Sequence, residues 1–173
     1  MPLSKDTLKS NILQAYNDIL DGKITFDNPP DPAPPGMSKQ LAAALADAYD
    51  KYAKQAQAGA LTVSVPGVKA TLESNLKGSE EYGGWAVGVG LYWAPVMFAG
   101  GGYIPANPVV PTTVTTVISG IAGDMPGYIK TERDSVDKAA GDLAELLHKH
   151  TTKLQVLSTT TSTPPVINME SVS

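Results

Sequence analysis

The only two histidines of this chain, His148 and His150, are its clearest candidates for metal or acid–base chemistry. Both fall in a segment with helical spacing, where residues two apart point about 200° away from each other. A metal site with two ligands on one helix needs a spacing of three or four residues instead. The pattern therefore argues against a metal site. It predicts that one ring packs inside the protein while the other meets solvent.

Paired carboxylates and glycine-rich loops are the next candidates. Glu80 and Glu81 are adjacent, but general acid–base catalysis needs carboxylates that converge on one substrate, and an exposed turn accounts for this pair. The glycines at 83–84, 88–90 and 100–102 match neither the dinucleotide-binding nor the P-loop pattern. The chain also has no cysteine, no G-x-S-x-G and no H-E-x-x-H. We therefore predict no catalytic residue, no cofactor and no bound metal, so the protein is not expected to be an enzyme.

The most unusual feature of the chain is a segment without charge. No Asp, Glu, Lys or Arg occurs between Glu81 and Asp124, and most of the aromatic residues lie in this window, together with many glycines and prolines. The part from 85 to 104 is long enough to cross a bilayer. However, Pro95 and five glycines interrupt it, and no Lys/Arg excess flanks it. A protein core and a protein interface are the other two environments that suit residues 82–123.

Hydrophobic periodicity predicts a mostly α-helical α+β protein with short strands. The expected helices cover residues 4–20, 38–58, 67–77, 112–121 and 126–150, and residues 82–92 could form another. A strand is expected at 61–65, a loop at 100–102, an extended stretch at 104–111 and a strand or arm at 153–163. We divide the chain into an N-terminal helix (1–26), a proline-rich connector (27–37), a helical core (38–152) and an extended C-terminal arm (153–173), whose last residues are expected to form a tail.

Two of the expected helices resemble each other. The segment Leu45–Tyr52 aligns with Leu143–His150 at an offset of 98, and each is followed by a β-rich stretch. A duplicated helix–strand unit around one core would produce this echo. Chance similarity between Ala- and Leu-rich helices is the alternative.

Composition excludes some partners. The net charge is −4 and Arg133 is the only arginine, so no basic stripe is available for nucleic-acid phosphates. The N-terminal residues show no basic region followed by an apolar run, so no signal peptide is expected. We predict no direct nucleic-acid binding.

Several short motifs together resemble a known class of proteins. They are the start Leu3–Lys9, the alanine-rich Leu45–Tyr49, the Trp/Pro/Phe/Gly-rich middle, the helix Leu143–His148 and a threonine-rich strand with a short tail. This organisation is similar to that of small virion structural proteins from the tail, neck and baseplate modules of contractile-tailed bacteriophages. No motif is diagnostic of one position in the particle.

The resemblance implies a non-catalytic assembly subunit. Its partners would be other virion proteins and copies of itself, and its location the virion after synthesis in the host cytoplasm. A membrane-active protein that inserts residues 82–123 is the alternative, although we expect no membrane partner. The residues predicted to anchor the core or an interface are Trp85, Tyr92, Trp93, Phe98, Tyr103, Val156 and Thr160.

Overall fold

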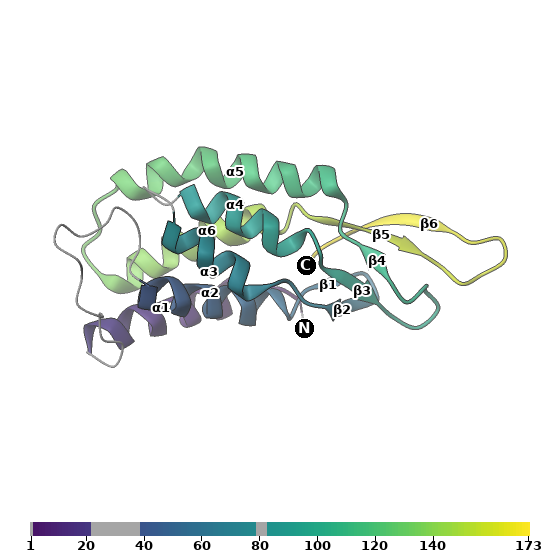
Figure 1. The fold of residues 1–173 in the computed structure, drawn as a ribbon, viewed down its shortest axis with the longest axis horizontal. Coiled ribbons are helices and arrows are strands. Elements are labelled where there is room, and N and C mark those ends of the chain that lie inside the picture. Colours follow the sequence, from purple (N-terminus) through teal and green to yellow (C-terminus); the bar gives the residue numbers. More distant parts are fainter. Residues whose placement is uncertain (1, 22–38, 79–82) are drawn as a thin grey trace.

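The structure is a computed structural model of the 173-residue chain, and it describes residues 2–21, 39–78 and 83–173. The fold is α+β and mostly α, as the sequence predicted. It is elongated: the helices gather in a bundle at one end, and the strands extend from the other (Figure 1). The predicted connector (27–37), Glu80 and Glu81 lie outside the described residues.

Six helices make up the bundle in the described part of the chain. They are α1 (Lys5–Leu20), α2 (Lys39–Ala53), α3 (Lys69–Gly78), α4 (Gly83–Trp93), α5 (Pro111–Lys130) and α6 (Val136–Thr151). Side-chain caps begin two of them, because the hydroxyls of Ser4 and Ser135 accept hydrogen bonds from the backbone N–H three residues later. Each of these two helices also has an aspartate in its first turn, where the negative charge interacts favourably with the positive end of the helix dipole.

The prediction of one helix over 126–150 is wrong. Helix α5 continues through Pro126 to Lys130, and a separate helix α6 begins after Ser135. Proline removes one backbone hydrogen bond inside a helix. Pro126 is exposed, as is Ala122, whose carbonyl loses its donor, so water can replace the missing bond. The buried neighbours Ile121 and Met125 hold this turn of α5 against the core.

The strands form two antiparallel sheets whose edge strands are joined by isolated bridges. One sheet has the order β1 (Gln57–Ala58), β2 (Leu61–Val65), β3 (Met97–Ala99) and β4 (Asn107–Pro108), and the other pairs β5 (Gln155–Thr159) with β6 (Ile167–Ser171). An isolated bridge links Val109, after β4, to Val156 of β5, and a second links Val172, after β6, to Ala58 of β1. Strand pairing therefore runs from β1 to β6 and returns to β1.

Three of the helices pass into strands in the same way. Helices α2, α4 and α6 end at Ala53, Trp93 and Thr151, and each is followed by a two-residue turn, one buried apolar residue and a strand whose second residue is buried. The buried apolar residues after the turns are Ala56, Val96 and Leu154. The offset of 98 between Ala53 and Thr151 is the offset of the sequence echo. The helix–strand unit thus occurs three times, and two of its copies coincide with the echo in the sequence.

Glycines allow α4 to lie close to two other helices. A Cβ atom at Gly88 would come 2.8 Å from Leu72 of α3, and a Cβ atom at Gly90 would overlap Ile118 of α5. Gly88 and Gly90 lie on opposite sides of α4, so the helix is held between α3 and α5. Val87 and Leu91 lie on the side of α4 that neither α3 nor α5 covers, and both are exposed.

The C-terminal arm is a β-hairpin that packs on its own chain. The prediction of a tail at the C-terminal end is wrong, because Ile167–Ser171 forms β6 and pairs along β5. Val156 and Val172 are buried in the common core. The hairpin tip reaches beyond the rest of the molecule (Figure 1, yellow).

Candidate interaction surface

Four of the predicted anchors lie in the core. Trp85, Tyr92, Trp93 and Phe98 are all at most 1% exposed. Trp85 and Tyr92 pack against Tyr49 of α2, whose ring centre lies 6.2 Å from that of Trp85 and 5.7 Å from that of Tyr92, both edge to face. Edge-to-face packing at these distances stabilises aromatic pairs. These four residues therefore hold the protein together and are not available to a partner.

A buried hydrogen-bond chain connects three helices through Tyr49. The indole N–H of Trp93 (α4) donates to the Tyr49 hydroxyl at 2.8 Å, and that hydroxyl lies 2.7 Å from Oγ1 of Thr151 (α6). All three side chains are fully buried. Burial also raises the pKa of the Tyr49 hydroxyl, so it stays protonated. These hydrogen bonds fix α2, α4 and α6 relative to one another.

Asp50 is the one buried carboxylate among the described residues, and it has partners. Tyr92 donates its hydroxyl to Oδ1 at 2.8 Å, and the Lys54 ammonium lies 2.7 Å from Oδ2. Burial is the main cause that raises the pKa of the Tyr92 hydroxyl, and Asp50 adds to it. The group is therefore a paired structural carboxylate.

The two histidines face different helices, as their spacing predicted. His148 lies 2.9 Å through Nδ1 from the hydroxyl of Tyr52 on α2, whereas Nε2 of His150 lies 2.7 Å from Asp124 on α5. His150 is buried and His148 is half-buried, so the prediction of one solvated ring is only partly right. Hydrogen bonds from Lys149 and then from His150 hold the pKa of Asp124 below its usual value. The described residues contain no cluster of three metal-ligating side chains.

The remaining predicted anchors belong to the β end. Val156 is buried, while Tyr103 and Thr160 are half-buried and face each other across an isolated bridge. The Thr160 hydroxyl accepts a hydrogen bond from the Val166 N–H at 2.9 Å and so closes the hairpin turn. Their contacts are structural.

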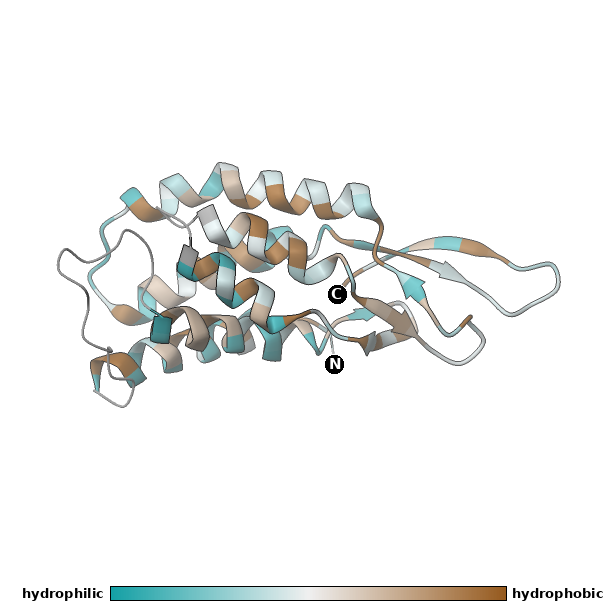
Figure 2. Ribbon diagram, viewed as in Figure 1, coloured by the Kyte–Doolittle hydropathy of each residue, from teal (hydrophilic) through white to brown (hydrophobic). Residues whose placement is uncertain are grey.

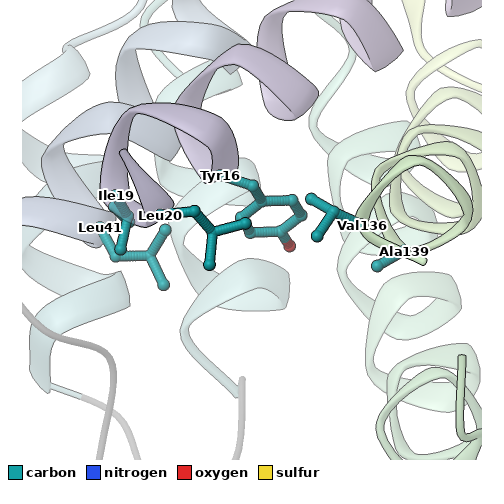
Figure 3. A pocket seen from close by; sticks show the side chains of 6 residues that line it. All are labelled: Tyr16, Ile19, Leu20, Leu41, Val136 and Ala139. Carbon is teal, nitrogen blue, oxygen red and sulfur yellow. The ribbon is translucent and has the colours of Figure 1, made fainter. Parts of the chain in front are cut away.

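An apolar pocket of about 270 Å³ opens between α1, α2 and α6 (Figure 3). The side chains that line the pocket are those of Tyr16, Ile19, Leu20, Leu41, Val136 and Ala139. Among them, only that of Tyr16 has a polar group. Leu20 ends α1 and Leu41 lies in the first turn of α2, and residues 22–38 are outside the part of the chain that the structure describes. We assign this pocket no ligand.

Among the described residues, the exposed positions of α4 and of α5 up to Gly123 carry no charge. Val87 and Leu91 of α4 are each 47% exposed. Beside them α5 exposes small and neutral residues: Thr112, Thr115, Thr116, Ser119, Ala122 and Gly123. We call these eight residues the neutral face. In Figure 2 the half of α5 near the strands is pale and brown, and strong teal appears only toward its other end.

Most of the ion pairs lie on the other helices. Ion pairs join α1 to α6 (Lys5–Glu145 at 2.5 Å and Lys9–Asp137 at 2.8 Å) and α2 to α3 (Asp47–Lys69 at 2.9 Å). The surface is thus divided: residues 82–123 supply both the aromatic core and a neutral exterior. The residues predicted as anchors belong to the buried half of this window, and no residue of the exposed half was predicted. A 3.6-residue reading of the Ser, Thr and Ala positions in 112–123 would have found it.

The comparisons with known proteins found no relative. No protein-family profile matches the sequence, no curated protein is significantly similar to it, and no solved structure significantly resembles its fold.

Proposed function

We propose that this chain is a non-catalytic structural subunit of a multi-protein particle, of the kind found in the tail and neck modules of tailed bacteriophages. The neutral face carries the proposal. Its partners would be neighbouring subunits of the particle, which cover α4 and α5. The sequence resemblance supplies the type of particle.

Charge depletion marks the centre of protein interfaces, because an ion that is buried without a partner costs several kcal/mol. The neutral face has this composition, whereas α1, α2 and α6 carry the exposed ion pairs of a solvated surface. Thr, Ser, Ala and Gly side chains are short, which allows another backbone to approach α5 closely. Val87 and Leu91 supply exposed apolar area at its border. An interface with a protein partner suits all these features.

The test is the protein content of particles purified from cells that carry the native gene. Quantitative mass spectrometry should find this chain at a fixed ratio to the other structural proteins across the particle peak. A chain that stays in the soluble fraction, away from particles, would contradict the proposal.

A membrane-active role is the second candidate, because residues 82–123 lack charge. Among the described residues no helix has both the length and the apolar character needed to cross a bilayer. The largest apolar side chains of the window also lie in the core. Flotation of the purified chain with liposomes separates the two roles: we expect it to remain at the bottom of the gradient. Stable flotation without any protein partner would favour the membrane role.

A further inference from the structure

Two groups of exposed large apolar side chains lie on different parts of the molecule. Val87 and Leu91 of α4 are each 47% exposed and belong to the neutral face. On the β5–β6 hairpin, Ile167 is 63% exposed and Met169 is 61% exposed, and Leu157, directly opposite Met169, is 39% exposed. We call Leu157, Ile167 and Met169 the hairpin face.

The hairpin face carries no charge. Glu170 is the only charged residue from 154 to 173, and it pairs with the buried Val156, whereas Met169 pairs with Leu157. Neighbouring residues of a strand point to opposite faces of the sheet, so Glu170 lies on the inner side of the hairpin. A Cβ atom on Gly59 would come 3.1 Å from its carboxylate there. The hairpin face can therefore be covered without burying an ion.

The hairpin also extends far enough to reach a neighbouring molecule. β1 lies beside its base, where Ala58 bridges Val172. The tip reaches beyond the rest of the molecule (Figure 1, yellow), and residues 161–166 of the turn are all exposed.

We propose that the hairpin face of one copy of this chain packs on the neutral face of a second copy. The contact joins side chains and needs no backbone pairing: Ile167 and Met169 pack against Val87 and Leu91. The short side chains of α5, such as Ser119, let the hairpin approach closely. The inference rests on the neutral face of the proposed function and names the partner of that face.

Charge favours this pair of faces. Elsewhere the bundle exposes ion pairs, such as Lys9–Asp137 and Asp47–Lys69. A contact over these helices would bury or break such pairs, and an ion that is buried without a partner is costly. The neutral face and the hairpin face contain no charged residue, so each can cover the other at no such cost.

Contacts between two like faces are the alternatives. Each would join two copies by a two-fold axis and leave the other apolar face of both copies in water. A contact between unlike faces covers both, because every copy gives its hairpin to one neighbour and its neutral face to another. Repetition of this contact builds a ring or a helical stack of copies. The large side chains of the hairpin face also suit the short ones of α5.

Two blocked variants test the contact on the pure chain. Leu91→Lys blocks the neutral face and Met169→Lys blocks the hairpin face, both at exposed positions, and circular dichroism confirms that both fold. By sedimentation velocity, the wild type should form oligomers, whereas each variant alone should stay monomeric. Their mixture should form dimers, because each variant keeps the face that the other has lost.

The mixture distinguishes the proposed contact from its alternatives. The dissociation constant of the mixed dimer should be at least about tenfold lower than that of either variant alone. Ser10→Lys, at an exposed position of α1, should associate as the wild type does. A monomeric wild type, or a mixture that associates no more than its components, would overturn the proposal.

Single cysteines locate the contact, because the natural chain has none. A short bismaleimide cross-linker should join Leu91→Cys to Met169→Cys in a mixture of the two variants, with one variant isotope-labelled so that its mass identifies it. Ser10→Cys replaces Leu91→Cys as the control. Cross-links that form mainly within one variant, or equally with Ser10→Cys, would contradict the contact between unlike faces.

This contact and the proposed function fail in different experiments. A chain that occurs in particles at a fixed ratio, but whose blocked variants do not associate when mixed, keeps the function and loses this partner. A chain that associates through these two faces but is absent from particles keeps the contact and loses the function.

Discussion

Replacing Tyr49 by phenylalanine should remove a hydroxyl that joins three helices. The hydroxyl accepts the Trp93 indole N–H at 2.8 Å and lies 2.7 Å from the Thr151 hydroxyl. Phenylalanine keeps the ring and its packing against Trp85 and Tyr92, but leaves two buried polar groups without this partner. An unpaired buried donor or acceptor costs about 1–3 kcal/mol.

The expected loss in the free energy of unfolding is about 2–4 kcal/mol. The lower end applies because a freed threonine hydroxyl can turn toward a backbone carbonyl of its own helix. With a urea m-value of about 2 kcal/mol/M, the midpoint should fall by about 1–2 M. Both tryptophans are buried, so their fluorescence reports the transition.

Tyr103→Phe is the matched control. Tyr103 is half-buried at the loop after β3, and a change at such a surface position usually stays within about 0.5 kcal/mol. A Tyr49→Phe midpoint that falls no further than that of Tyr103→Phe would refute the role of the hydrogen-bond chain. Adding Thr151→Val to Tyr49→Phe should cost less than the sum of the two single changes, because both remove the same contact.

Two further predictions concern α5 and α6. Gly120→Ala should destabilise the protein by about 1–3 kcal/mol because its Cβ would overlap the His150 ring. Gly123→Ala on the same helix meets no atom within 4 Å and should stabilise the protein by about 0.5–1 kcal/mol. Thermal unfolding compares the two variants, and a change of the same sign in their melting temperatures would contradict the packing. Burial lowers the pKa of His148, so the unfolded chain binds its proton more readily and stability should fall as the pH drops below about 6.5. His148→Gln should flatten urea midpoints measured between pH 7.5 and 5, and an unchanged slope would exclude His148 as the cause.

Local patterns in the sequence predicted the helical half of the fold well. The apolar spacing of Leu8, Ile12 and Ala15 marked α1, and the alternation in Leu61–Val65 marked β2, because each element buries one face of its own period. The boundary between α5 and α6 was missed because Pro126 usually begins a helix. The Ser135 cap, which does begin one, was overlooked.

Long-range pairing explains the other errors. β6 has no strong local strand pattern, and it forms because β5 and the end of β1 provide backbone partners for Ile167–Val172. The candidate interaction surface was also predicted only in part. Aromatic residues of the charge-free window were correctly associated with a core or an interface, but burial alone decides between the two. Small residues such as Ser119 were not predicted to form an interaction surface, because that role depends on their exposure beside Val87 and Leu91.

A single substitution in the neutral face tests the central claim most directly. Ser119→Arg places a cation on exposed α5, and Ser74→Arg makes the same change at an exposed position on α3, beside residues that are already charged. An arginine buried without a partner in an interface should weaken binding at least about tenfold. Mass spectrometry of purified particles should therefore find Ser119→Arg strongly depleted and Ser74→Arg at the wild-type level. Equal incorporation of the two variants would contradict the account.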